Sequence, residues 1–125
     1  MYSNLYTIAT DKLNIEQLKD FFKVCRLDEL SEKRGKKFLV NDVEIALFKI
    51  DENVYALNNI CTHLHASIIF DGFIEDDCVV CPAHGWEYRL KDGKRADGRK
   101  GLDSYQVKIV ESDVYVKVFK KIFNW

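Results

Sequence analysis

Two short clusters of cysteine and histidine constrain the fold of this chain more than any other feature of its sequence. Cys61 and His63 are separated by one residue, Cys81 and His84 by two, and seventeen residues lie between the two clusters. Thiolate and imidazole are common protein ligands of zinc and of iron–sulfur clusters. The fold is therefore expected to bring two loops, distant in sequence, to one metal site.

The context of the four cysteines favours metal or free thiols over disulfides. The N-terminal stretch from Met1 to Leu5 lacks the charged-then-apolar form of a secretory signal, so we expect a cytoplasmic protein. In that reducing compartment disulfides are rare. The chain has 125 residues, 47% of them hydrophobic, which predicts one globular domain. The net charge of −1 argues against binding to nucleic acid, and neither charge nor hydropathy favours a membrane.

Turn signals about ten residues apart predict an all-β domain. In the last predicted strand Val114, Val116 and Val118 alternate with other side chains, as in a half-buried strand. Turns flank both clusters, so each cluster is expected at the tip of a hairpin. The strands are expected at residues 24–27, 37–40, 43–50, 54–58, 78–80, 86–90, 105–110 and 114–119.

The two ends of the chain are expected to lie outside this domain. Residues 1–21 are interpreted as a partly helical extension, because Asn14 and Gln17 match a capping box and Ile15 and Leu18 follow at helical spacing. The main domain is expected at residues 22–119, with its metal-binding part at about 59–90. A short aromatic tail spans residues 120–125.

Two kinds of metal site use two cysteines and two histidines. One is a tetrahedral structural zinc site, and the other is a [2Fe–2S] cluster with two cysteines on one iron and two histidines on the other. Zinc sites usually space their cysteines two to four residues apart and their histidines three to five. A Cys-x-His pair does not easily bring both side chains onto one metal. The spacing therefore favours the cluster, in which each loop gives one ligand to each iron.

The sequence resembles the Rieske-type ferredoxins from about Phe22 to Val118. The resemblance implies an antiparallel β-sandwich with a small cluster-binding subdomain made of two hairpin loops. It also implies a [2Fe–2S] cluster and one-electron transfer. The family's C-x-H and C-x-x-H motifs, with a spacer of this length, are met here by Cys61, His63, Cys81 and His84.

Several positions depart from the family's pattern. Ala66 and Ala83 replace the cysteines that form a disulfide beside the cluster in cytochrome-complex members. Pro82 is the only proline, so residues 94–103 must cover the cluster without one. Trp86 holds the place of a serine donor, and the place of a tyrosine donor is held by Tyr88 at most. With fewer hydrogen bonds to sulfur, we expect a reduction potential near the low end of the Rieske range, about −150 mV.

These features predict a soluble one-electron carrier between a reductase and a terminal enzyme such as an oxygenase. We expect an electron-transfer protein rather than an enzyme by itself. A first alternative is the small Rieske-like subunit of an assimilatory nitrite reductase. A second alternative is an interaction module with a structural zinc ion, which the colour of the purified protein would distinguish.

Other residues that suggest chemistry have plainer interpretations. His65 is expected in a solvated loop, and Cys25 and Cys78 as buried thiols. Two alternatives stay open for Trp86, which shields the cluster or fills the core. The basic run is expected to be a solvated face, with the steering of an acidic partner as the alternative; it comprises Arg89, Lys91, Lys94, Arg95, Arg99 and Lys100.

Overall fold

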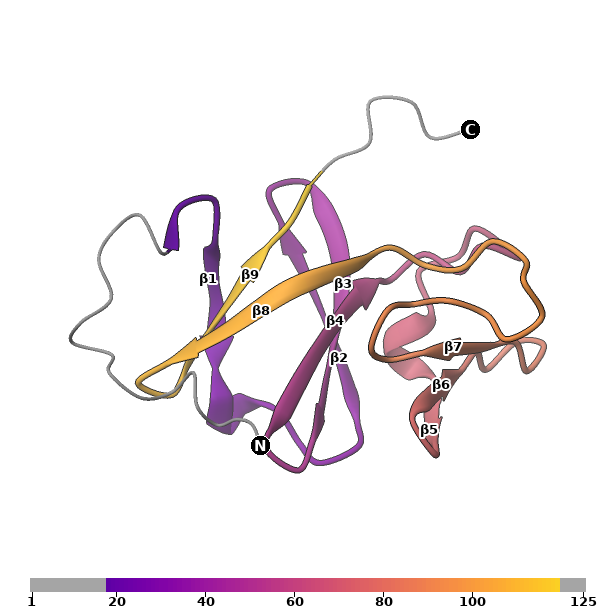
Figure 1. Cartoon of the computed structure of the whole chain (residues 1–125), viewed down its shortest axis with the longest axis horizontal. Helices are drawn as coiled ribbons and strands as arrows, with labels where there is room; N and C mark the ends of the chain where they lie inside the picture. The colour runs from indigo at the N-terminus through magenta and orange to yellow at the C-terminus, as the bar shows by residue number, and fades with distance from the viewer. Residues whose placement is uncertain (1–17, 120–125) are drawn as a thin grey trace.

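The computed structural model describes residues 18–119, and its regular structure is β-strand apart from short 3-10 turns (Figure 1). The predicted all-β class is confirmed for this part of the chain. The helix expected near Asn14 and the tail at 120–125 lie outside the described residues. No helix within 18–119 is long and apolar enough to cross a membrane.

Within residues 18–119, nine strands form two antiparallel sheets. Each strand predicted from the sequence is present, with its ends within two residues of the expected bounds. The larger sheet has the order β1-β9-β8-β4-β3-β2 and contains β1 (Phe22–Arg26), β2 (Gly35–Val40), β3 (Val43–Ile50), β4 (Asn53–Asn58), β8 (Ser104–Val110) and β9 (Asp113–Lys117). The smaller sheet has the order β5-β6-β7 and contains β5 (Phe73–Glu75), β6 (Cys78–Val80) and β7 (Glu87–Arg89).

The larger sheet is nearly closed, which differs from the two packed layers of the expected sandwich. Strands β4 and β8 pair directly, Ala56 opposite Tyr105 and Leu57 opposite Ser104, and this pairing joins the two halves into one sheet. The right-handed twist of strands accumulates across six of them and curls the sheet. The edge strands β1 and β2 thereby come into contact. The difference arises from one long-range pairing that no local pattern specifies.

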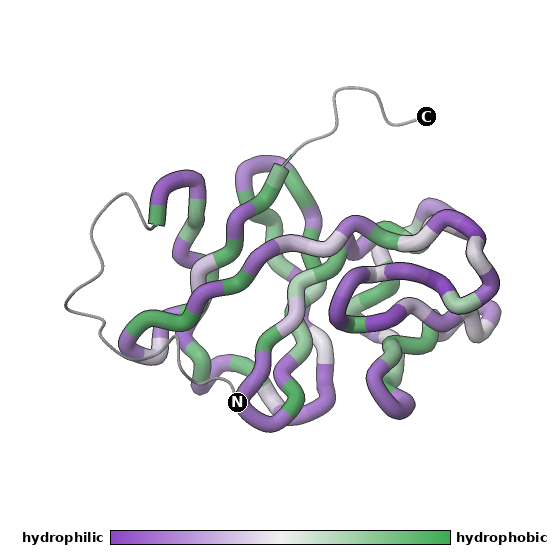
Figure 2. The backbone as a smooth tube through the Cα atoms, in the orientation of Figure 1, coloured by the Kyte–Doolittle hydropathy of each residue, from purple (hydrophilic) through white to green (hydrophobic). Residues whose placement is uncertain are grey.

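Strand β3 separates two hydrophobic cores. Ile45 and Leu47 point into the core enclosed by the larger sheet, whereas Ala46 and Phe48 point into a second core. Alternate side chains of a strand face opposite sides, so a strand buried on both sides reads as a continuous apolar run. Figure 2 shows the hydrophobic colour concentrated on the strands and the hydrophilic colour on the turns. The second core packs the smaller sheet against the outside of β3.

Asn59 anchors the segment that contains both Cys/His clusters, which lies at one end of the larger sheet (Figure 1). Its side chain is completely buried. The amide Nδ2 donates to Glu44 Oε1 at 3.1 Å, and Oδ1 accepts from the Phe70 N–H at 2.7 Å. One side chain thus ties strand β3 to both ends of the first cluster loop.

Candidate metal centre

The first loop turns back on itself around Cys61. The Cys61 N–H donates to the Ala66 carbonyl at 2.9 Å, and the His65 N–H donates to the Cys61 carbonyl at 2.7 Å. An antiparallel bridge between Ile60 and Ser67 closes the loop. His65 adopts a left-handed conformation with φ of 56°. The loop is a hairpin tip that buries its cysteine completely.

The second loop repeats this backbone pattern between β6 and β7. The Cys81 N–H donates to the Trp86 carbonyl at 2.8 Å, and the Gly85 N–H donates to the Cys81 carbonyl at 3.0 Å. Gly85, four residues after the cysteine, takes the left-handed conformation that His65 takes in the first loop. His65 therefore occupies a turn position, exposed to solvent as the sequence predicts. The two loops are structural copies that place each cysteine alike.

The structure brings the four predicted ligands together in two like pairs. The Sγ atoms of Cys61 and Cys81 lie 3.5 Å apart, and the ring centroids of His63 and His84 lie 4.5 Å apart. The thiols are buried and both imidazoles are exposed. Within residues 18–119 no three His, Cys, Asp or Glu side chains are grouped as ligands of one metal ion. Thiols on one side and imidazoles on the other fit the donor set of a Rieske-type [2Fe–2S] cluster.

Hydrogen bonds prepare Cys61 for ionisation. Burial acts to raise the pKa of this thiol, but hydrogen bonds from the Leu64 N–H, the Tyr88 hydroxyl, the His63 N–H and the Cys81 thiol together outweigh burial and lower the pKa below its usual value. Burial raises the pKa of Cys81, whose sulfur also lies beside that of Cys61. Two adjacent thiolates repel each other, so the pair is stable as thiolates only with a cation between or beside them. The pair therefore suits metal binding.

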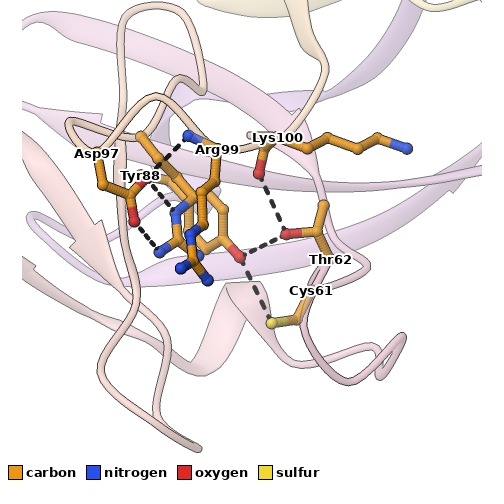
Figure 3. Close-up of polar contacts among 7 residues, drawn as sticks. Cys61, Thr62, Tyr88, Asp97, Arg99 and Lys100 are labelled. Carbon is orange, nitrogen blue, oxygen red and sulfur yellow. Dashed lines mark hydrogen bonds and ion pairs between the residues drawn. The ribbon is translucent and has the colours of Figure 1, made fainter.

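Tyr88 provides a hydroxyl beside the first cysteine, as Figure 3 shows. Its oxygen lies 3.6 Å from Cys61 Sγ and 2.9 Å from Thr62 Oγ1. Burial raises the pKa of Tyr88 to about 12, so the hydroxyl keeps its proton. A thiolate only accepts hydrogen bonds. Tyr88 therefore donates to Cys61, and Thr62 donates to the Tyr88 oxygen in preference to the more distant Lys100 carbonyl at 3.5 Å.

Trp86 lies between a predicted ligand and a cation. Its ring stacks on His63, with centroids 4.3 Å apart and an interplanar angle of 25°. The guanidinium carbon of Arg95 lies 3.5 Å from the Trp86 ring centroid. Two groups this close to one centroid must lie on opposite faces of the ring. Trp86 is partly buried and packs against the second core, which agrees with the core interpretation. Its shielding of the cluster stays a prediction.

Residues 94–103 lie beside the site, where the Lys100 carbonyl is 3.5 Å from Thr62 Oγ1 and Arg95 packs on Trp86. That they cover the cluster stays a prediction. Arg95 forms a two-point ion pair with Asp97, and Asp97 also accepts from the Arg99 N–H at 3.0 Å (Figure 3). Sequence reasoning placed Arg95 in a solvated basic face, and for this residue the expectation was wrong, because its side chain is only 8% exposed. It also missed Thr62. Thr62 is the variable position of the C-x-H motif and Arg95 lies in no ligand motif, so only the folded structure identifies their contacts.

The two other cysteines lie outside the site. Cys25 is buried in the core of the larger sheet, as predicted. Cys78 is half-buried at the start of β6, so it is less buried than expected.

Comparison with known proteins shows one family throughout. The model of the Rieske-like [2Fe-2S] domain matches residues 20–117. The ferredoxin component of the naphthalene 1,2-dioxygenase/salicylate 5-hydroxylase systems of Ralstonia sp is 34% identical over 94 residues, which are 74% of this chain and 89% of that protein.

Two solved structures extend the comparison to the fold. A Mycobacterium tuberculosis protein described as an NADH-dependent nitrite reductase small subunit superposes with a TM-score of 0.75 at 25% identity, covering 81% of this chain and 96% of that one. The ferredoxin in a complex of reduced oxygenase and oxidised ferredoxin of carbazole 1,9a-dioxygenase superposes with a TM-score of 0.69 at 25% identity, covering 82% and 97%.

Proposed function

This chain belongs to the Rieske-like [2Fe-2S] domain family, and from that membership we propose which side chains hold its cluster and which partners it connects. As a Rieske ferredoxin it binds a [2Fe–2S] cluster and transfers electrons. We further propose that residues 22–119 form the cluster-carrying domain, with the cluster-binding part at about 59–90.

Cys61 and Cys81 would hold one iron, and His63 and His84 the other. The support is the Sγ–Sγ distance of 3.5 Å on the buried side and the close approach of the two rings on the exposed side. When bound, the cluster accepts and releases one electron. Imidazole is neutral where thiolate is negative, so such a site is easier to reduce than one with four cysteines.

The surrounding residues divide the site into a dry side and a side open to partners. The completely buried Cys61 and the nearly buried Cys81 keep water from the thiolates. The exposed rings of His63 and His84 are the ligands that a partner can touch, so they mark where a partner docks. Leu64, 45% exposed beside His63, adds an apolar contact at the same surface.

The proposed partners are a cytoplasmic reductase that supplies electrons and a terminal oxygenase that receives them. This proposal is supported by the likeness to an oxygenase-system ferredoxin over most of both chains. The carbazole dioxygenase ferredoxin, which has the same fold, is found in complex with its oxygenase. The reduction potential is proposed to lie near −150 mV, roughly the low end for this family, because Trp86 stands where a serine donor is expected.

The second candidate is the small subunit of a nitrite reductase, favoured by the TM-score of 0.75. Purification from the native cell distinguishes the two. A stable one-to-one complex with a large siroheme reductase supports the subunit, and recovery as a free monomer that reduces an oxygenase supports the carrier.

Cluster content tests the proposed ligands. The purified protein should be red-brown, contain about two irons per chain, and give a reduced EPR signal with an average g of about 1.9. Cys61→Ser and Cys81→Ser should lose the cluster. Cys25→Ser and Cys78→Ser are matched controls and should keep it. A colourless, zinc-loaded protein from anaerobic preparations would contradict the proposal.

A further inference from the structure

Three side chains form a stack on the exposed side of the site, here called the His63 stack: His63, Trp86 and Arg95. Trp86 is the middle member, 4.3 Å from the His63 centroid and 3.5 Å from the Arg95 guanidinium carbon. His63 comes from the first cluster loop, Trp86 follows the second, and Arg95 comes from the loop at residues 94–103. The stack therefore joins all three loops around the metal centre.

Arg95 is unusual for a residue in a surface loop. Its side chain is 8% exposed, whereas that of its ion-pair partner Asp97 is 45% exposed. Asp97 occupies Nε and Nη2 of the guanidinium. The third nitrogen, Nη1, is buried and has no hydrogen-bond partner within the described residues. Burying a donor without a partner is unfavourable. The ion pair with Asp97, which joins two residues of the loop, therefore does not by itself explain why the Arg95 side chain is buried.

A second ion pair in the same region provides a comparison. Arg89 makes the same two-point contact with Asp92, at 3.2 Å from Nε and 2.8 Å from Nη2. The Arg89 side chain is 49% exposed, and that of Asp92 is 29% exposed. An arginine can thus tie this region together while remaining in water. The burial of Arg95 against Trp86 is a separate feature.

We propose that Arg95 is a positioning residue of the metal centre, which presses Trp86 onto His63 and places a buried positive charge beside the cluster. This inference rests on the proposed function, because it takes His63 as a ligand.

The stack would act first on orientation. A ring packed against a flat neighbour loses freedom to rotate, and a guanidinium is drawn to the face of an indole ring. With Arg95 on one face, the Trp86 ring is held with its other face against His63. The His63 ring is thereby kept nearly parallel to the indole ring. Removing the guanidinium frees both rings while the backbone pattern of the loops remains.

The stack would act second through charge. Arginine stays protonated in proteins, and its charge is weakly screened where water is excluded. A positive charge favours the reduced form of the centre, which holds one more electron. Asp97 offsets part of this charge, so the two residues should shift the reduction potential in opposite directions.

Voltammetry of the cluster-loaded protein tests the proposal with Arg95→Gln, Arg95→Lys and the matched control Arg89→Gln. Arg95→Gln should keep the cluster and weaken the reduced form about tenfold relative to the oxidised form, which is 59 mV downward for one electron. Arg95→Lys keeps the charge without the planar face, so it should restore most of the potential but not the shape of the EPR spectrum. Arg89→Gln should change neither.

The proposal is overturned if Arg95→Gln keeps both the potential and the EPR spectrum of the unmodified protein. Should Arg95→Gln fail to hold a cluster, Asp97→Asn decides: it keeps the Arg95 charge and removes the offsetting one, so the potential must rise, and an unchanged or lower potential rejects the inference. Failure of the proposed function is seen separately, because the unmodified protein would then contain no iron–sulfur cluster.

Discussion

The hydroxyl oxygen of Tyr88 lies 3.6 Å from the Sγ of Cys61, although the two residues are 27 positions apart. Tyr88 comes from the central part of β7, is completely buried, and reaches the thiol from the second core. The contact links the small sheet to the first cluster loop at Cys61, a proposed ligand.

Replacing Tyr88 by phenylalanine should lower the reduction potential. The ring keeps its packing, but the thiolate loses a donor that stabilises the more negative, reduced state. A hydrogen bond to a charged group contributes about 1.5–3 kcal/mol, and only part of this differs between oxidation states, so the expected shift is tens of mV. Voltammetry measures it. Tyr105→Phe, which removes a hydroxyl bonded to Asn58 on the larger sheet, is the control and should leave the potential unchanged.

Replacing Asn59 by alanine should destabilise the metal-binding segment. The change removes two hydrogen bonds and leaves the Phe70 N–H without its acceptor. The expected loss is roughly 2 kcal/mol, because an unpaired, partly buried donor adds some desolvation to the lost bond. Thermal unfolding followed by the visible absorbance of the cluster measures the loss. Gln106→Ala, at an exposed position of β8, should be neutral; equal midpoints for the two variants would contradict the anchoring role.

Cys25 should make stability depend on alkaline pH. Burial raises the pKa of its thiol to about 11 from a usual value of 9.0. The unfolded chain loses this proton at lower pH than the folded chain, so stability is fully present below pH 9 and decreases as pH rises toward 11. The loss approaches roughly 2 kcal/mol for such a shift. Denaturant unfolding of the unmodified protein and of Cys25→Ala between pH 8 and about 11 gives the difference, which should be constant if the thiol does not contribute.

The exposed lysines and arginine of the basic run at residues 89–100 should steer an acidic partner toward the site. Of the six basic residues, Arg89 and Arg95 are paired with aspartates, which leaves four exposed in this region: Lys91, Lys94, Arg99 and Lys100. Charge complementarity mainly affects the association rate. The rate of electron exchange with the reductase should fall several-fold in Lys100→Glu and should decrease with added salt.

Lys117→Glu, on β9 outside the cluster loops, is the matched control for this charge reversal. It should retain the rate. A rate that does not depend on salt, or an equal loss in both variants, would show that this region is a solvated face.

Local sequence patterns predicted the strands well, and they pointed to the two Cys/His clusters that the structure brings together. The strand at residues 43–50 is apolar on both faces, and a two-residue turn at Asn41 and Asp42 precedes it, so its bounds follow from neighbouring residues alone. The cysteine and histidine clusters were evident because ligand spacing within a loop is a local property. Strand β5 was not predicted, because its three residues form no recognisable period.

Other features depend on contacts between distant parts of the chain. The pairing of Leu57 with Ser104 closes the larger sheet, and it joins residues that no short-range pattern relates. The role of Arg95 was misjudged for the same reason. A cation in a basic run looks solvated until the loop folds over Trp86 and excludes water from the guanidinium.

Residue types and their spacing were enough to predict an all-β frame and two loops, each with one cysteine and one histidine as proposed ligands. Those are properties of residue type and spacing, which act over a few positions. The tertiary structure decided how the loops meet, with thiols inward and imidazoles outward, and which side chains surround them. Burial and hydrogen bonding set the pKa of Cys61 and the donor role of Tyr88, and ring packing forms the stack on His63. These contacts arise only where distant segments pack together and exclude water.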